Sequence, residues 1–476
     1  MAVDQERLRR VLDPSSVTVV GDKAPMYGWL TRQKEFDGPL YSVQVDPKEI
    51  AGIEERGFTN FTSLADVPGD IDLVICAVPR AITPRIVADC AARGVGGIAM
   101  FTSGFAETGE PDAIELQRQI VEIANDAGMP IVGPNCLGVY NRRVGVRFGD
   151  DQIVGGEGNV AVAGQSGTNS SGLISAMQRI GLKVGRGVSY GNAVVVNECD
   201  YLEYYLADPA IEVIVMYVEG LKDARRFFEL LREGTKRKPV VLWRGGQTEA
   251  GARAVQSHTA SLASSVAVWQ AMLEQTNAIG TGSLEETVDV ASVLVNTAPS
   301  TGRDIALIGM NGGQAVALTD QFSLAGFRVP QLSEASYQQL ASFFMAVGSS
   351  YRNPFDAAST IRGEDDNLAK ILEIIGQDDV INGGVALELG ARDLEDGAKE
   401  LDRMLELLEK YRTETGEPVL ALMHDQGGGR GGAAAMVRAR EYVGERGFAV
   451  TPSYHRGAQA LGRAVTYYER RAAMGA

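Results

Sequence analysis

The chain has 476 residues, a length typical of about three domains, and its 45% hydrophobic and 22% charged residues are those of a globular protein. The formal net charge of −16 argues against nucleic acid as a partner, because a phosphate backbone needs a basic surface. No apolar run approaches the ~18 residues of a membrane span, no apolar leader follows Met1, and the four cysteines lack metal-ligand spacing, so we expect a cytoplasmic protein without membrane association or a resident metal.

Apolar, strand-like runs alternate with helix-like segments between residues 15 and 148. This alternation predicts a parallel sheet with right-handed crossovers, in which all strands end at the same edge. Doubly wound sheets bind their ligands at that edge. The predicted strands are Val17–Val20, Tyr41–Val45, Leu73–Val78, Gly97–Phe101 and Pro130–Val132, and the predicted helices are Pro47–Gly57, Ile82–Arg93 and Asp112–Ala127.

The turn after the first strand contains Gly21, Asp22 and Lys23, and it lacks the three glycines of a dinucleotide fingerprint. After the second strand, Asp46 is followed by Pro47 and Lys48, and a lysine suits a phosphate better than a ribose hydroxyl. Coenzyme A, with its additional phosphates, therefore fits this edge better than NAD. Glycine and proline also mark the other strand ends, at Val78-Pro79, Ser103-Gly104 and Gly133-Pro134-Asn135-Cys136.

A second α/β unit is predicted after a polar linker around residues 141–158. It opens with strand Asn159–Ala163, then Gln165-Ser166-Gly167 and a helix, which is the geometry of an anion site at a helix N-terminus. A simple tight turn explains the same residues equally well. Strand Val213–Val218 ends at Glu219, which we expect on the ligand side of the sheet, although a solvated residue at a helix start is the alternative.

A loop of small residues is predicted after strand Pro239–Trp243, and it contains His258. Glu219 and His258 follow two successive strands of one parallel sheet, so they can be neighbours at its carboxyl edge. A loop histidine without a role is the alternative interpretation of this residue.

A third α/β unit is predicted after a linker at residues 297–303. It begins with strand Ile305–Gly309, then Asn311-Gly312-Gly313 and helix Gln314–Ala325. The later strands are predicted at Phe327–Pro330, Gly384–Leu389 and Pro418–Met423, and the later helices at Ala335–Ala346, Leu394–Thr413, Ala433–Gly444 and Gly457–Arg471. His424, with Asp425 and the glycines of 427–432, indicates either a further polar site or a flexible loop. We predict an α/β fold with three consecutive doubly wound domains, residues 1–148, 149–300 and 301–476.

Taken in order, these motifs resemble the NDP-forming (ADP-forming) acyl-CoA synthetases, relatives of succinyl-CoA synthetase, and specifically their alpha-type subunits. The resemblance is carried by Val20-Gly21, Ser103 to Glu107, Gly133 to Gly138, Gln165-Ser166-Gly167, Tyr217 to Gly220, Glu249 to Thr259, Asn311-Gly312-Gly313 and Asn353 to Asp356. It implies a Rossmann-like CoA-binding domain followed by two flavodoxin-like ligase domains.

The resemblance also implies a mechanism and its residues. His258 would take the phosphoryl group of an acyl phosphate and pass it to ADP, while Glu219 would hold its other ring nitrogen. CoA would be bound by Gly21, Asp22, Lys23, Lys48, Val78, Pro79, Ser103 and Gly104. The phosphate or acid substrate would be bound by Asn135, Cys136, Gln165, Ser166, Gly167, Asn311, Gly312 and Gly313, with two helix N-termini cradling the phosphate. For Cys136, a small buried thiol is the alternative.

The nucleotide-binding ATP-grasp part of such enzymes has no counterpart in this sequence. The resemblance therefore implies a separate ATP-grasp beta subunit that holds ATP or ADP and Mg²⁺, in a heterotetramer, with a small carboxylic acid as substrate. Departures from the family pattern occur at Asp22, Gln247 and Ala260. A noncatalytic CoA-binding or regulatory subunit on the same fold is the alternative function, and a Rossmann oxidoreductase is disfavoured by the poor fingerprint.

Overall fold

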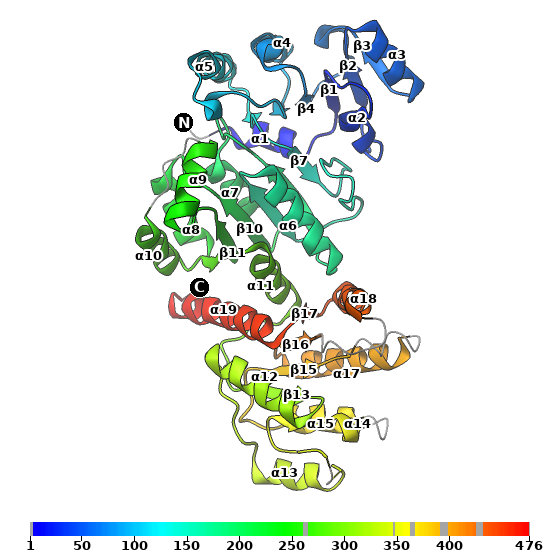
Figure 1. The fold of residues 1–476 in the computed structure, drawn as a ribbon, viewed down its shortest axis with the longest axis vertical. Helices are drawn as coiled ribbons and strands as arrows, with labels where there is room; N and C mark the ends of the chain where they lie inside the picture. Colours follow the sequence, from blue (N-terminus) through cyan, green and yellow to red (C-terminus); the bar gives the residue numbers. More distant parts are fainter. Residues whose placement is uncertain are drawn as a thin grey trace. The chain divides into compact units, whose positions relative to one another are not determined.

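The computed structural model describes residues 3–259, 265–345, 348–361, 367–390, 398–424 and 432–475, with only the backbone described at 254, 256–259 and 432 (Figure 1). The chain forms two compact units. The first consists of Met1–Gln178 and Lys183–Leu284, and the second of Arg179–Leu182 and Glu285–Ala476. The described residues form one sheet in the second unit and two in the first.

The first sheet has the strand order β3-β2-β1-β4-β5-β6, with every neighbouring pair parallel. This is the order of a Rossmann fold, and it reverses direction between β1 and β4. In its apolar core, strand residues such as Ile98 pack with helix residues such as Val87 and Ile120. The elements are α1 (Gln5–Leu12), β1 (Val17–Val20), α2 (Gly28–Arg32), β2 (Leu40–Val43), α3 (Pro47–Glu55), β3 (Thr59–Phe61), η1 (Leu64–Asp66), β4 (Leu73–Cys76), η2 (Arg80–Ile82), α4 (Thr83–Arg93), β5 (Gly97–Met100), η3 (Ala106–Thr108), α5 (Pro111–Asp126) and β6 (Ile131–Val132).

The second sheet has the order β12-β11-β10-β8-β9-β7. Without β7, which is antiparallel to β9, this is the 2-1-3-4-5 order of a flavodoxin-like fold, and its direction reverses between β8 and β10. The elements are β7 (Gly138–Asn141), β8 (Val160–Gly164), α6 (Gly167–Arg179), β9 (Val184–Ser189), α7 (Glu198–Ala207), β10 (Val213–Val218), α8 (Ala224–Gly234), β11 (Val240–Arg244), α9 (Glu249–Thr259), α10 (Val266–Thr276) and β12 (Ile279–Thr281).

The third sheet, in the second unit, has the order β14-β13-β15-β16-β17, again the flavodoxin-like pattern, with the reversal between β13 and β15. Its core joins strand residues such as Leu387 to helix residues such as Ile371 and Leu405. The elements are α11 (Leu284–Asn296), β13 (Ala306–Gly309), α12 (Gly312–Leu324), α13 (Glu334–Ala341), β14 (Phe355–Asp356), α14 (Ala358–Ile361), α15 (Asn367–Gly376), β15 (Val385–Glu388), α17 (Lys399–Thr415), β16 (Val419–Leu422), α18 (Gly432–Glu445), β17 (Ala449–Thr451) and α19 (Tyr454–Ala473).

The predicted fold class, an α/β chain with successive doubly wound sheets, is confirmed by these strand orders. The exact domain limits stay a prediction. In detail, β7 lies before residue 149 but pairs with β9 of the second sheet, and α11, although it lies within residues 149–300, belongs almost wholly to the second unit.

Two local predictions are wrong. The segment predicted as a loop before His258 is helix α9, because its alanines favour helix and Glu249 in the first turn suits the positive helix end. The segment predicted as strand Phe327–Pro330 forms only an isolated bridge between Arg328 and Asp304. The segment from Asp425 to the glycine-rich run lies outside the described residues, apart from the backbone of Gly432.

Candidate functional site

The reversal point of the first sheet brings two predicted CoA-binding residues into contact. Gly21 follows β1 with a φ of +86°, and a Cβ on it would lie 2.5 Å from Cγ1 of Val78, which follows β4. Only glycine accepts both this conformation and this contact. The Gly21 N–H donates to the carbonyl of Val43 at 3.1 Å, and Gly21 and Val78 lie at the point where Rossmann folds bind a ligand.

Asp22, a predicted CoA-binding residue, bonds to the backbone of its own turn and of α2. Its carboxylate is buried and accepts the backbone N–H of Leu30 at 2.8 Å and of Lys23 at 3.1 Å. Burial raises the pKa of the Asp22 carboxyl, and these N–H bonds partly oppose the shift. The carboxylate thus occupies the donors of the first turn of α2, which leaves those donors unavailable to a phosphate.

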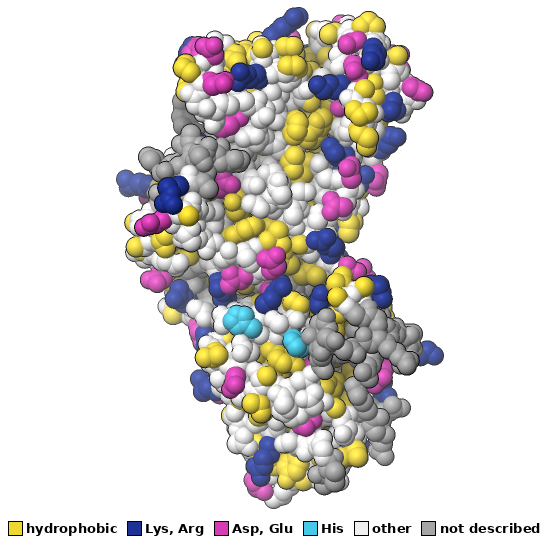
Figure 2. Space-filling model, viewed as in Figure 1, with side chains coloured by type: hydrophobic (Ala, Val, Ile, Leu, Met, Phe, Trp, Pro, Cys, Tyr) yellow, Lys and Arg dark blue, Asp and Glu magenta, His cyan; other side chains and the backbone are white. Residues whose placement is uncertain are grey.

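Two exposed lysines supply positive charge near the same turn. Lys23 follows Asp22, and Lys48 lies in the first turn of α3. The backbone N–H of Ala24 donates to Glu49 at 2.8 Å, so the turns after β1 and β2 are joined. Basic side chains are scattered among acidic ones on the face drawn in Figure 2, rather than gathered into one patch. Individual cations at this edge therefore fit a small phosphate-bearing ligand such as CoA.

Arg80, which the sequence analysis missed, joins the ends of β4 and β5. Its guanidinium donates to the carbonyl of Gly104 at 2.6 Å, and the Thr102 hydroxyl donates to the carbonyl of Val78 at 2.6 Å. Pro79 and Ser103 are exposed beside these bonds. The signal in the sequence was a cation directly after a strand-terminating proline.

The turn after β6 carries Asn135 and Cys136, and the side chain of Cys136 is the more deeply buried of the two. Asn135 has a φ of +59° and its side-chain amide donates to Asn192 at 3.4 Å. The Cys136 thiol is buried and donates to the carbonyls of Met100 and Val132, and burial raises its pKa to about 12. Cys136 therefore packs inward, in keeping with the alternative of a small buried thiol, and its contact with a ligand stays a prediction.

The reversal point of the second sheet brings Gln165 and Glu219 together. The Gln165 side-chain oxygen accepts the backbone N–H of Glu219, and that of Gly220 at 2.9 Å. Both side chains are at least nine-tenths buried. Gln165 thus fixes the strand end that carries Glu219, and its contact with a phosphate stays a prediction.

The surroundings of Glu219 include Tyr217, at the end of β10, and Gly245, which follows β11. The Tyr217 hydroxyl donates to Glu219 Oε1 at 3.1 Å, and burial followed by the nearby Glu219 charge raises the Tyr217 pKa. A Cβ on Gly245 would lie 2.7 Å from that hydroxyl and 3.1 Å from Cγ of Glu219. A glycine here lets the chain after β11 pass directly over Glu219 before α9 begins.

His258 lies near the C-terminal end of α9, where only the backbone is described. The predicted pairing of its imidazole with Glu219 therefore stays a prediction. The described residues show the path of the chain from Glu219 to His258: the turn at Gly245 passes over Glu219, and α9 follows this turn.

The helix N-terminus after β8 is partly occupied by its own residues. The Ser166 hydroxyl accepts the backbone N–H of Asn169 at 3.3 Å, which is a helix cap. A Cβ on Gly167 would lie 3.0 Å from the Leu137 side chain, so this turn adjoins the one carrying Asn135. The structure therefore brings two of the predicted phosphate-binding turns together.

Asn311, Gly312 and Gly313 are exposed at the start of α12, in the second unit. Asn311 caps the helix by accepting the backbone N–H of Gln314 at 2.9 Å. Beside it, buried Glu388 accepts the Met310 N–H at 3.0 Å and the Tyr454 hydroxyl at 2.8 Å, a connection that the sequence did not indicate. Because these residues and Gln165 belong to different units, the two-sided phosphate cradle stays a prediction.

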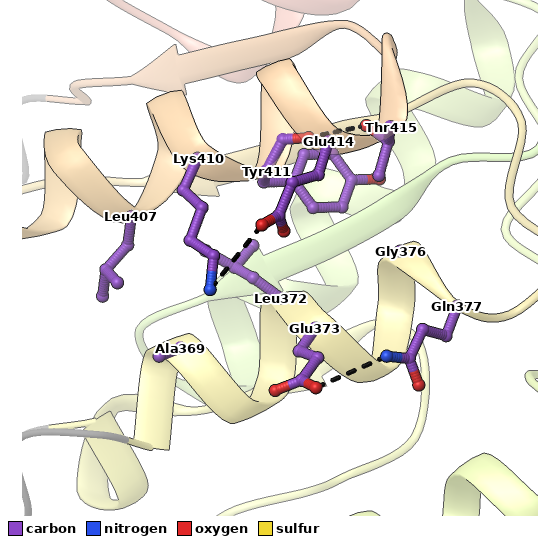
Figure 3. A pocket seen from close by; sticks show the side chains of 10 residues that line it. All are labelled: Ala369, Leu372, Glu373, Gly376, Gln377, Leu407, Lys410, Tyr411, Glu414 and Thr415. Carbon is purple, nitrogen blue, oxygen red and sulfur yellow. Dashed lines mark hydrogen bonds and ion pairs between the residues drawn. The ribbon is translucent and has the colours of Figure 1, made fainter.

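A pocket of about 250 Å³ lies between α15 and α17 and is lined by none of the predicted site residues (Figure 3). Its walls carry the ion pair of Lys410 and Glu414 at 3.8 Å. Within the described ranges, no cluster of three or more histidine, cysteine or acidic side chains has the arrangement of a metal site. Nor does any helix there combine the length and the apolar character needed to cross a bilayer.

Comparison with known families assigns the two sheets of the first unit. Residues 16–142 match the model of a CoA-binding domain, and residues 157–294 match that of a succinyl-CoA ligase-like flavodoxin domain.

Individual relatives match a larger part of the chain. The alpha subunit of ADP-forming acetate–CoA ligase II from Pyrococcus furiosus is 31% identical over 358 residues, which is 74% of this chain and 76% of the relative. ADP-forming acetate–CoA ligase I from Archaeoglobus fulgidus is 30% identical over 79% of this chain, which spans only 54% of that relative. Among solved structures, the dinucleotide-forming acetyl-coenzyme A synthetase 1 of Ca. Korarchaeum cryptofilum, in complex with phosphate and ADP, superposes with a TM-score of 0.82 and 25% identity, covering 98% of this chain and 97% of that one.

Proposed function

The chain belongs to the family of ADP-forming acid–CoA ligases, as an alpha-type subunit, and from that premise we propose that it interconverts a carboxylic acid, CoA and ATP with acyl-CoA, ADP and phosphate. One observation carries the proposal. The ligand edge of the CoA-binding sheet and the Gln165–Glu219 edge of the ligase sheet lie in one compact unit, joined through the turns of Asn135 and Asn192. Such a junction suits a reaction that passes from a thioester to a phosphate.

The CoA edge would hold its ligand by backbone and lysine contacts. Gly21 and Val78 lie in contact at the reversal point of the sheet, and exposed Lys23 and Lys48 are available to phosphate groups. CoA supplies the thiol that carries the acyl group. Because Asp22 already satisfies donors of α2, the lysines rather than that helix end would neutralise the phosphates.

The phosphoryl group would pass through His258. An oxygen of inorganic phosphate forms a bond to the thioester carbonyl carbon, the carbon–sulfur bond breaks, and the thiol leaves with a proton. A nitrogen of the His258 imidazole then takes the phosphoryl group from the acyl phosphate and releases the carboxylate. Imidazole suits this step because one of its nitrogens is unprotonated near neutral pH.

Glu219 would hold the second imidazole nitrogen and so fix its tautomer. The support for this role is its position, since Glu219 is buried at the reversal point and is oriented by Tyr217. His258 finally transfers the phosphoryl group to ADP, which yields ATP and restores the free imidazole.

The site for ADP would lie on a second polypeptide. The Archaeoglobus fulgidus relative is a chain of which this one spans 54%, so a comparable activity here needs further protein. We propose an ATP-grasp beta subunit that holds the nucleotide and Mg²⁺, assembled as a heterotetramer in the cytoplasm. A small carboxylic acid would be the other substrate.

Activity of the reconstituted complex tests the proposal. The chain and its ATP-grasp partner are mixed with ATP, CoA, Mg²⁺ and a panel of short carboxylic acids, and ADP and acyl-CoA are measured. We expect equimolar ADP and acyl-CoA with at least one acid. A complex that binds CoA by calorimetry but forms no acyl-CoA with any acid would instead favour a noncatalytic CoA-binding subunit.

A further inference from the structure

Glu107 lies where the CoA-binding sheet meets the ligase sheet. It is the middle residue of η3, directly after the turn of Ser103 and Gly104 that follows β5. Its carboxylate accepts the backbone N–H of Gly104 at 2.6 Å and of Phe105 at 3.0 Å. Two main-chain amides of the proposed CoA turn are therefore fixed by this one side chain, through charge-assisted hydrogen bonds.

The same carboxylate reaches the ligase sheet. Oε2 of Glu107 accepts the side-chain amide of Asn192 at 2.7 Å, and Asn192 follows β9. Asn192 in turn accepts the side-chain amide of Asn135 at 3.4 Å and donates its backbone N–H to Pro134 at 3.0 Å. Three turns from two sheets thus meet around Glu107.

The helix that carries His258 adjoins this junction. The backbone of α9 contacts η3, so Glu107 lies in the element between the proposed CoA turn and the phosphohistidine helix. Gly191 also approaches Asn135 closely, since a Cβ there would lie 2.3 Å from the Asn135 carbonyl oxygen. The turns that carry Gly191 and Asn135 are therefore packed so closely that a side chain at position 191 would not fit between them.

We propose that Glu107 is a positioning residue for acyl transfer, which holds the CoA turn in register with the phosphate site of the ligase sheet. This inference rests on the proposed function. Without the carboxylate, the Gly104–Phe105 turn and Asn192 lose their common partner, and the thioester carbon and the phosphate are no longer held in a fixed geometry. Phosphorylation of His258 by ATP does not use the CoA turn, so it does not depend on Glu107.

Two half-reactions of the complex with the ATP-grasp subunit separate these roles. In one, labelled ATP phosphorylates the chain without CoA. In the other, labelled phosphate does so with the acyl-CoA that the wild-type complex uses best. For Glu107→Gln we expect the ATP-driven rate to stay within about twofold and the acyl-CoA-driven rate to fall about 100-fold, the size expected for a misplacement of about 1 Å. KM for the acyl-CoA should rise at the same time.

Two further variants complete the test. Asn192→Ala removes the other half of the connection and should reproduce the selective loss, which decides the matter if Glu107→Gln unfolds. Glu122→Gln changes an exposed carboxylate on α5, paired with Arg118 at 2.9 Å, and should alter neither half-reaction.

The outcomes are distinct. Equal slowing of both half-reactions by Glu107→Gln and Asn192→Ala, or no effect on either, overturns the positioning role. Failure of the wild-type complex to label from either donor overturns the proposed function itself, and the inference with it.

Discussion

Gly21→Ala is the substitution whose effect on the CoA edge follows most directly from the structure. At this position the φ is +86°, and an added Cβ would lie 2.5 Å from Val78 Cγ1 and 3.3 Å from the Val78 backbone. Gly57 is a matched control in the same domain, because its φ is +84° and nothing lies within 4 Å of an added Cβ. The two substitutions share the backbone strain and differ in the steric clash.

The strain of a left-handed alanine is about 1–2 kcal/mol, and forcing extra volume into a packed site adds about 1–3 kcal/mol. We therefore expect Gly57→Ala to lower the free energy of unfolding by about 1–2 kcal/mol and Gly21→Ala by about 2–5 kcal/mol. Adding Val78→Ala to Gly21→Ala should relieve part of the clash. The effects of the two substitutions on the free energy of unfolding should therefore be non-additive.

Urea unfolding of the full chain measures these free energies, and calorimetry measures its affinity for CoA. Gly21→Ala should weaken CoA binding by at least tenfold, while Gly57→Ala should leave it unchanged. A Gly21→Ala chain as stable as Gly57→Ala, with unchanged CoA affinity, would refute the reasoning about this edge.

Three other predictions concern buried groups. Tyr217→Phe removes the hydroxyl bonded to Glu219 and should slow phosphorylation of the chain by ATP in the complex about fivefold, because a hydrogen bond is worth about 1 kcal/mol and about 1.36 kcal/mol is a factor of ten. An unchanged labelling rate would contradict the orienting role. The Cys136 thiol, with its pKa raised to about 12, should resist iodoacetamide at pH 8 until the chain is unfolded, and rapid alkylation of the native chain would show otherwise. Burial raises the pKa of the Glu198 carboxyl, so its favourable contribution to stability should be present below about pH 4.3 and be lost as the pH rises through the folded-state pKa. As the pH rises from 4 to 7, the urea concentration at the unfolding midpoint should therefore fall further for the wild type than for Glu198→Gln. An equal pH dependence of the two midpoints would argue against a raised pKa of Glu198.

The fold and the strand ends were predictable because both depend on short-range signals. A short, β-branched apolar run such as Val213–Val218 favours a buried strand, and a glycine or proline close after it marks the edge where ligands bind. The order of the motifs at these strand ends along the sequence carried the family resemblance. Gly21 was correctly predicted to follow the first strand for this reason, although its contact with Val78 depends on two strands far apart in the sequence.

The side-chain connections were not predictable, because they join residues from different strand ends. Nothing in the sequence indicates that Asp22 turns inward to the amides of α2, or that Glu107 bonds to Asn192. The segment of His258 was misassigned because its small residues and glycines suggested a loop, whereas its alanines form helix α9. Arg80 was passed over, and Tyr217 was noted only as part of the motif that contains Glu219, because their contacts appear only once their partners are placed.

Phosphorylation of His258 tests the central claim most directly. The complex with the ATP-grasp subunit is incubated with labelled ATP and Mg²⁺, and the label on this chain is tested for acid lability and located by mass spectrometry. We predict an acid-labile phosphate on His258 that is lost in His258→Asn and retained in His455→Asn, an exposed histidine on α19 bonded to Gln321 at 3.0 Å. An active complex whose label persists in His258→Asn, or is found on another residue, would contradict the account.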